Sequence, residues 1–152
     1  MILKAGDTIS GQEGKATAKI NGQVVDMFYI KTIEATVEKN KIEVRTLGKR
    51  GVQHKTTGWS GTGSMTVYYV TSDFVRMAKE YVKNGKDTYF TITIENYDPT
   101  STIGTQTVTL FDVNIDSIPI AKLSVEDEVL ECDMDFTFQD LDLTNEFSVP
   151  TV

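Results

Sequence analysis

The stretch Leu130–Phe138, LECDMDFTF, decides the fold because its apolar and polar residues alternate without a break. The apolar members are Leu130, Cys132, Met134, Phe136 and Phe138, and the polar members between them are Glu131, Asp133, Asp135 and Thr137. A period of two predicts an extended strand with one face in a core and the other in water. Three successive carboxylates on one face repel each other unless solvent stays close. The strand therefore needs open, aqueous space on its polar side.

The length and composition fit a single domain that spans residues 1–152. A chain of 152 residues buries about two-thirds of its unfolded surface without disulfides or metals. The only cysteine, Cys132, falls on the apolar side of the alternating strand, and we interpret it as a small buried hydrophobe. The first residues do not resemble a signal-peptide core, and no apolar run approaches the roughly 20 residues of a membrane helix. We therefore expect a soluble chain with no export signal and no membrane partner.

The charges of the chain are separated along the sequence. The net charge is −7, and the nine acids between Leu123 and the end are accompanied by no Lys or Arg. Residues 48–64 hold Lys49, Arg50, His54 and Lys55 and no acid at all. Such separation suits head-to-tail contact between copies, in which the basic part of one meets the acidic part of the next. An accident of surface composition is the alternative explanation, and charge alone does not decide between the two.

The first half of the chain predicts an arm, two hairpins and a long loop. Residues 1–14 contain three glycines and little periodicity, which indicates an arm or loop that a partner could order. Strands at 15–20 and 23–25 flank Asn21-Gly22, a dipeptide typical of two-residue hairpin turns. A second hairpin is predicted from strands at 33–38 and 42–45, with Glu38–Lys41 as its turn. The five glycines of residues 48–64 then predict a long Gly-rich basic loop, which in a compact domain is usually functional or disordered.

The second half predicts further strands and one helix. A strand at 65–70 is followed by a helix from Asp73 to Lys83, with Ser72 as its cap and Asn84-Gly85 as its end. The helix carries a stripe that we interpret as core covering the sheet: Phe74, Val75, Met77, Ala78, Tyr81 and Val82. Strands at 88–95 and 105–118 follow, and the apolar phase of the second slips at Leu110-Phe111, which predicts a β-bulge or sharp bend.

These elements together predict a mainly β (α+β) protein: an antiparallel sandwich or barrel with one packed helix. Beyond the alternating strand, residues 143–152 predict a loose tail.

The sequence carries no convincing catalytic, metal-binding or cofactor-binding motif. GWSGTG at residues 58–63 lacks the Lys-Ser/Thr ending of a phosphate loop and precedes a strand. One His and one Cys nearly exclude transition-metal sites built on those ligands, and His54 has no acid within its loop to orient it as a base. The acidic residues also oppose stable binding of nucleic acid, whose phosphates are held chiefly by basic side chains. We therefore expect no enzyme activity and no cofactor.

Several segments in chain order resemble the tail tube proteins of contractile bacteriophages and of related defective-prophage and phage-tail-like bacteriocin particles. The segments are DTISGQEG at 7–14, IEATVEKNK at 33–41, HKTTG at 54–58, GTG at 61–63, VTLFDVN at 108–114 and DFTFQD at 135–140. The resemblance implies a hexameric ring, stacked into a tube inside a contractile sheath, through which DNA or an effector passes. It also implies baseplate and tail-terminator proteins as partners, transient and non-adhesive contact with DNA, and a location in a virion tail or tail-like particle assembled in the host cytoplasm.

Two groups of residues are the candidates for function in such a tube. The candidates for wet, lumen-facing carboxylates are Asp112, Asp116, Asp133 and Asp135, with an outward orientation beneath the sheath as the alternative. The candidates for contacts between rings are Lys49, Arg50, His54, Lys55 and Trp59; for Trp59 the alternative is a partly buried core position. A hypothesis of another class is a monomeric ligand-binding β-barrel or small hydrolase, which predicts an apolar cavity or a cleft with convergent polar groups.

Overall fold

The computed structural model describes residues 2–26 and 30–151, so Met1 of the predicted arm and Val152 of the predicted tail lie outside the described residues. In chain order the elements are a 3-10 helix η1 (Ala5–Asp7), β1 (Gly14–Ile20), β2 (Gln23–Asp26), β3 (Ile30–Val44), β4 (Gln53–Tyr68), α1 (Asp73–Asn84), β5 (Phe90–Tyr97), β6 (Thr105–Ile115), β7 (Glu131–Phe138) and β8 (Asp140–Asn145). Within these ranges no helix is both long and apolar enough to cross a membrane.

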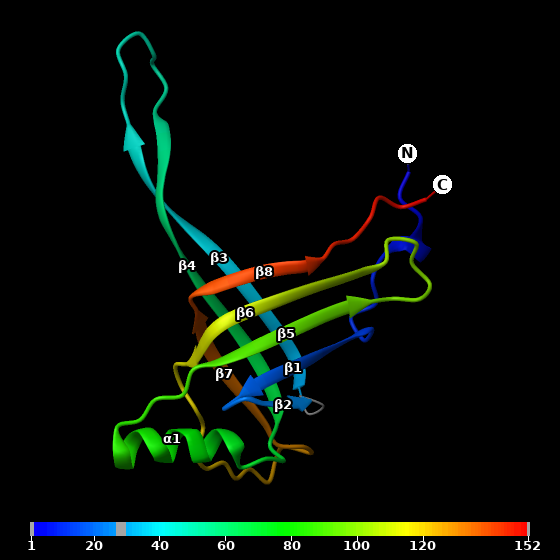
Figure 1. Ribbon diagram of the computed structural model, residues 1–152, viewed down its shortest axis with the longest axis vertical. Coiled ribbons are helices and arrows are strands. Elements are labelled where there is room, and N and C mark those ends of the chain that lie inside the picture. Colours follow the sequence, from blue (N-terminus) through cyan, green and yellow to red (C-terminus); the bar gives the residue numbers. More distant parts are fainter. Residues whose placement is uncertain (1, 27–29, 152) are drawn as a thin grey trace.

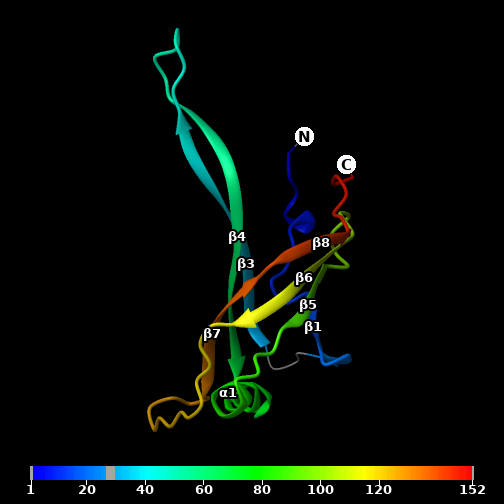
Figure 2. The same ribbon diagram turned by 60° about the vertical axis from the view of Figure 1, so that its left-hand side comes forward.

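The strands form two layers that cross each other (Figure 1). The hydrogen-bonded order is β2-β1-β5-β6-β7-β4-β3, with β8 paired to β6, and the pairs are antiparallel. We call β1, β2, β5, β8 and the first part of β6 the β5 layer, and β3, β4 and β7 the β7 layer. Turning the molecule by 60° shows the two layers diverging from a shared corner (Figure 2). The predicted antiparallel sandwich with one helix is thereby confirmed.

The alternation in β7 places its apolar residues in the core between the layers. Cys132, Met134, Phe136 and Phe138 are buried, whereas Asp133 and Asp135 are exposed on the other face. The remaining buried apolar side chains come from β1, β4, α1, β5 and β6: Ala18, Met65, Val67, Phe74, Phe90, Ile92, Leu110 and Val113. The strand thus has the dry face and the wet face that its sequence predicts.

A bulge in β6 carries the chain from one layer to the other. Leu110 pairs with Ile92 and Val113 with Phe90, so two residues of β6, Phe111 and Asp112, stand opposite one residue of β5. Asp112 has a φ of 54°, in the left-handed region, as the extra residue of a bulge often has. Beyond it, β6 pairs with β7 through Asn114 and Ile115. The predicted slip at Leu110-Phe111 is confirmed, and it is the corner at which the two layers join.

The first predicted hairpin is confirmed and the second is wrong. Asn21 and Gly22 have φ values of 52° and 82° between β1 and β2. Residues 38–41, predicted to turn, lie inside β3, which continues to Val44 and pairs with β4; the chain reverses only over residues 45–52. The predicted loop at 48–64 is therefore strand from Gln53 onward. The polar run at residues 38–41 was misleading because strands that project beyond the core do not need an apolar residue at every second position.

Three further predictions need correction. The apolar stripe of α1 covers the core only through its first turns, since Tyr81 is 58% and Val82 76% exposed. The first three residues of the loose tail predicted at 143–152 are the end of strand β8, which pairs with β6 as far as Asn145. The arm at residues 2–13, expected to be ordered by a partner, is hydrogen-bonded to its own chain through Asp7 and Ser10.

Two glycines of β4 make room for the aromatic rings of β7. Gly61 pairs with Phe138 and Gly63 with Phe136. A Cβ atom at Gly61 would lie 2.5 Å from the Phe138 ring, and one at Gly63 would lie 2.3 Å from the Phe136 ring and 2.6 Å from the Glu34 carbonyl oxygen. The Phe136 ring is fully buried, and the Glu34 oxygen belongs to the backbone. Neither can move easily to make room for a Cβ atom at Gly63.

Replacing Gly63 by alanine is expected to destabilise the subunit. Overpacking of a filled core costs about 1–3 kcal/mol, so Gly63→Ala should lower the free energy of unfolding by about that amount in urea denaturation followed by tryptophan fluorescence. Gly58→Ala on the same strand is the matched control, because its Cβ would approach nothing closer than 3.9 Å. Equal stability of the two variants would contradict the packing role.

Candidate functional site

The outer face of the β7 layer carries acidic and hydroxyl side chains. Ser64 of β4 stands between Glu34 of β3 and Asp135 of β7 in register, and Thr66 pairs with Asp133. These positions alternate with the buried ones, so the same three strands that supply the core present this polar face to water. The face is negatively charged and contains few groups that would hold an anion.

A hollow of about 460 Å³ on this face gathers three carboxylates from three parts of the chain. Its lining consists of Glu34, Thr36, Thr62, Gly63, Ser64, Asp116, Asp135 and Phe136. The Asp116 backbone N–H donates to the Asp135 carbonyl oxygen at 2.8 Å, which continues the pairing of β6 with β7. Beside the hollow, the Thr66 hydroxyl donates to Asp133 Oδ1 at 2.7 Å.

The structure brings together three of the four predicted carboxylates. Asp116, Asp133 and Asp135 share the outer face of the β7 layer, whereas Asp112 is exposed at the bulge and does not line the hollow. Glu34 belongs to the group but was not predicted as a site residue. Its signal was the alternation of residues 33–38, which the misplaced turn at 38–41 separated from the rest of the sheet.

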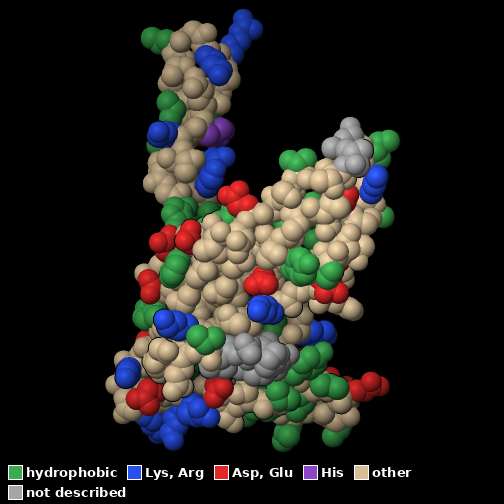
Figure 3. All heavy atoms as spheres, turned by 45° about the vertical axis from the view of Figure 1, so that its right-hand side comes forward, with side chains coloured by type: hydrophobic (Ala, Val, Ile, Leu, Met, Phe, Trp, Pro, Cys, Tyr) green, Lys and Arg blue, Asp and Glu red, His purple; other side chains and the backbone are tan. Residues whose placement is uncertain are grey.

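The predicted basic residues lie on a hairpin that projects from the body of the molecule. Lys49 and Arg50 occupy its tip at residues 45–52, and His54 and Lys55 begin β4. All four are exposed, and the space-filling view shows Lys, Arg and His side chains along this projection (Figure 3). Lys41 joins them from the opposite strand, and Arg45 from the start of the tip.

Trp59 lies apart from the basic tip, at the root of the hairpin. Its ring centroid is 6.1 Å from that of Phe138, with the ring planes tilted by 44°. The residue is 43% exposed, so it caps the end of the core and still offers surface to a partner. Aromatic side chains with this mixed exposure are enriched in interfaces.

The arm and the tail are fastened to one loop of the same chain, residues 98–104. Asp7 Oδ1 accepts hydrogen bonds from the Thr102 backbone N–H at 3.0 Å and from the Thr102 hydroxyl at 2.6 Å. Asp98 Oδ2 accepts one from the Ser10 backbone N–H at 3.0 Å, and the Thr151 N–H donates to Thr102 Oγ1 at 3.1 Å. We call this group the terminal clasp. It holds both chain ends on one side of the molecule (Figure 1).

The clasp lowers the pKa of both of its carboxyls. The pKa of Asp7 lies below its usual value because of the hydrogen bonds from the Thr102 hydroxyl and backbone. The pKa of Asp98 is lowered by the backbone hydrogen bonds from Ser10 and Thr100. The clasp therefore favours both groups in the ionised form.

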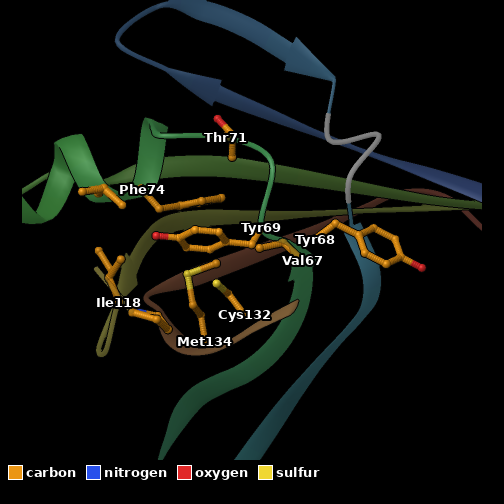
Figure 4. A pocket seen from close by; sticks show the side chains of 10 residues that line it. Val67, Tyr68, Tyr69, Thr71, Phe74, Ile118, Cys132 and Met134 are labelled. Atoms are coloured by element: carbon orange, nitrogen blue, oxygen red, sulfur yellow. The ribbon is translucent and has the colours of Figure 1, made fainter. Parts of the chain in front are cut away.

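A small apolar cavity lies where α1 packs on the β7 layer (Figure 4). Phe74 of α1, Tyr69 and Ile118 enclose it against Val67 and Met134, and its volume is about 10 Å³. A cavity of that size has no room for an organic ligand. Burial raises the pKa of the neighbouring Cys132 thiol, which agrees with the prediction of a structural rather than reactive cysteine.

Comparison with known proteins identifies the family. The model of the family described as phage tail tube protein matches residues 1–145. The chain belongs to the phage tail tube protein family. The predicted resemblance is thereby confirmed, and the tail tube subunit is a structural protein rather than an enzyme.

Sequence relatives and solved structures agree with this assignment. The tail tube subunit is 50% identical over 148 residues to the phage-like element PBSX protein XkdM of Bacillus subtilis (strain 168), covering 97% of this chain and 98% of the relative. It shares its fold with a chain of the anti-feeding prophage baseplate at a TM-score of 0.68 and 12% identity, covering 94% and 97% of the two chains. It also matches a chain of the PVC sheath–tube complex in its extended state, at a TM-score of 0.65 and 9% identity over 90% and 91%.

The terminal clasp is expected to open in acid. Because the pKa values of Asp7 and Asp98 are lowered in the folded chain, their contribution is complete above the ordinary carboxyl pKa of about 4 and is lost as the pH falls through the lowered values. Amide hydrogen exchange of residues 2–13, normalised to an unstructured peptide at each pH, should accelerate in that range. Asp7→Asn should already show fast exchange at pH 7, whereas Asp127→Asn, outside the clasp, should not. An arm that stays equally protected in Asp7→Asn would refute the clasp.

Proposed function

We propose that the tail tube subunit forms hexameric rings that stack into a tube, with the outer face of the β7 layer lining the bore. The observation that carries the proposal is the acidic and hydroxyl-rich face around Asp135, Asp116 and Glu34. A negatively charged wall repels phosphates, so DNA slides past it without adhering. The 6-fold symmetrised structure that contains one of the fold neighbours supports six copies per ring.

Unpaired strand edges explain how copies join within a ring. Strand β3 ends the strand order and, among the described strands, pairs only with β4. A long unpaired edge is a ready site for pairing with another chain. Pairing between the β7 layers of adjacent copies would make one continuous barrel and satisfy the backbone groups of β3.

The dimensions of such a barrel suit duplex DNA. Each copy supplies β3, β4, β7 and the last residues of β6. Six copies of four strands, about 4.8 Å apart and tilted by about 40°, close to a backbone diameter of roughly 48 Å. Side chains that take about 5 Å from each wall leave roughly 38 Å, which accommodates hydrated duplex DNA.

The remaining surfaces suit the partners of a contractile tail. The face of the β5 layer that does not contact the core points away from the proposed bore, toward a surrounding sheath. Rings at the two ends of the tube would meet baseplate and tail-terminator proteins. The subunit would assemble in the cytoplasm of the bacterial host and function in a virion tail or tail-like particle.

Reversing the charge of the proposed bore is expected to make tubes retain threaded DNA. In Asp116→Lys/Asp133→Lys/Asp135→Lys, tubes examined by electron microscopy should persist and should bind a short linear duplex in a salt-dependent manner. They should not bind closed circular DNA of several thousand base pairs, which cannot enter a bore of roughly 38 Å.

The control places three lysines on the opposite face of the molecule. Thr17→Lys/Thr93→Lys/Thr109→Lys lies on aligned positions of β1, β5 and β6 and should bind linear and circular DNA alike. If Asp116→Lys/Asp133→Lys/Asp135→Lys tubes also bound both linear and circular DNA, the β7 layer would face outward and the proposal would fail.

Reversing the charge of the hairpin is expected to weaken stacking. Lys49→Glu/Arg50→Glu/Lys55→Glu should raise the critical concentration for tube formation roughly tenfold, because exposed ion pairs contribute about 0.2–1 kcal/mol each and reversal replaces attraction by repulsion. Sedimentation and electron microscopy measure this. Lys15→Glu/Lys19→Glu/Lys83→Glu changes the net charge equally but leaves the hairpin intact. Unchanged tubes in the hairpin variant would refute the assignment.

A further inference from the structure

The segment between β6 and β7 displays apolar side chains that nothing in the subunit covers. Residues 116–130 have no regular secondary structure, and a loop of this length within a compact domain is usually functional or disordered. Four aliphatic residues in it are exposed, of which Leu123 is 96% and Val125 104% accessible; the other two are Ile120 and Val129. Isolated exposed aliphatic residues are common, but four within ten residues leave a surface that favours burial against a partner.

Acidic residues accompany these apolar ones. Residues 123–130 contain Glu126, Asp127 and Glu128 and no basic residue. The Lys122 Nζ donates to the Glu131 carbonyl oxygen at 2.6 Å, which ties the segment down before the acidic part begins. Among the hydrogen bonds of residues 2–26 and 30–151, none involves residues 123–129. This part of the segment is therefore free to make contacts outside its own chain.

The tip of the projecting hairpin has the complementary composition. Residues 41–55 carry five Lys or Arg residues and one acid, Glu43. Exposed aliphatic residues accompany these charges as well: Ile42, Val44, Leu47 and Val52. Each of the two surfaces thus combines exposed aliphatic side chains with a net charge, positive on the tip and negative on the segment.

The two surfaces lie at opposite ends of the β7 layer. Glu131, which follows the segment, pairs with Tyr68, whereas Phe138 at the other end of β7 pairs with Gly61. Residues 53–60 of β4 project past Phe138, a reach of about 26 Å at roughly 3.3 Å per residue. Figures 1 and 2 show the hairpin tip and the 116–130 segment at the two ends of the long axis. One subunit cannot bring its own tip and segment together.

We propose that residues 117–129 are the docking surface for the hairpin tip of a second copy in the adjacent ring. The proposal rests on the stacked tube proposed above and names the partner surface of its basic hairpin. A head-to-tail contact between different surfaces of copies in successive rings repeats along the tube axis without closing. It therefore gives the stack a direction as well as cohesion. The aliphatic residues supply contact area, and the charges select the correct partner end.

A competing surface at the same end of the molecule is less suited to a basic tip. A hollow of about 540 Å³ lies between the β1–β2 turn and α1. Its charged lining combines Arg76 and Lys86 with Asp73, Glu80 and Asp87, and Asp73 already pairs with Arg76 at 3.0 Å. A basic tip would meet two cations there, whereas residues 117–129 contain one, Lys122, whose Nζ already donates to the Glu131 carbonyl oxygen.

A charge-exchange experiment tests the docking surface. Lys49→Glu/Arg50→Glu and Glu126→Lys/Asp127→Lys should each raise the critical concentration for tube formation about tenfold, and their combination should restore it to within about twofold. Leu123→Ser/Val125→Ser should raise it even in 0.5 M salt, because salt screens only the charged part of the contact. Circular dichroism and thermal unfolding should show each variant folded, since the substituted side chains are exposed.

The control introduces the same charge change into the competing hollow. Glu80→Lys/Asp87→Lys should neither weaken assembly as strongly nor rescue Lys49→Glu/Arg50→Glu. Rescue by this pair, rescue by neither pair, or normal assembly of Glu126→Lys/Asp127→Lys would overturn the docking surface. Failure of the unaltered subunit to form tubes would instead refute the proposed function.

Discussion

The packing of two phenylalanine rings against two glycines fixes the register between β7 and β4, and the rest of the molecule depends on that register. Phe136 and Phe138 occupy the space left by Gly63 and Gly61. A slip of one residue would turn every side chain of β7 to the opposite face. The aspartates would enter the core, and the rings would enter water. The same contact therefore determines the hydrophobic core and the acidic face behind it.

The extent of that core explains why the basic hairpin and the 116–130 segment lie outside it. The layers share a corner where β6 bulges at Asp112 and the chain turns from β7 into β8, and the Gln139 N–H donates to the Phe111 carbonyl oxygen across it. Beyond Phe138 no β7 residue remains to pair with β4, so the basic hairpin projects without a covering layer. At the other end, α1 covers the core with its first turns and leaves the 116–130 segment outside. Both parts therefore extend beyond the core of the described residues.

The separation of charge acquires a physical meaning from this arrangement. In the sequence, the basic and acidic regions suited either contact between copies or accidental surface composition. In the structure, the five cations of residues 41–55 lie on one projection. Acids lie on a strand face and on the segment at the far end, where α1 also carries Arg76, Lys79 and Lys83. The opposite charges of the hairpin tip and of residues 123–130 favour contact between these two surfaces when copies meet end to end.

The sequence by itself determined the elements whose causes are local. Alternation defined β7, Asn21-Gly22 defined the first turn, the left-handed Gly85 ended α1, and the phase slip at Leu110-Phe111 located the bulge. The family resemblance also followed from sequence alone. In each of these cases the residues that cause the structure are neighbours in the chain.

Only the tertiary structure decided the features whose causes are distant in sequence. Gly61 and Gly63 read as loop residues because glycine usually marks a turn, but here each accommodates a ring from a strand some 70 positions later, as the pairing of Gly61 with Phe138 and of Gly63 with Phe136 shows. For the same reason, the sequence did not reveal that Glu34 belongs to the acidic group or that Thr102 binds Asp7 in the terminal clasp. Local patterns report backbone preference and burial, whereas the room for a side chain and the partner of a carboxylate depend on which strands lie side by side.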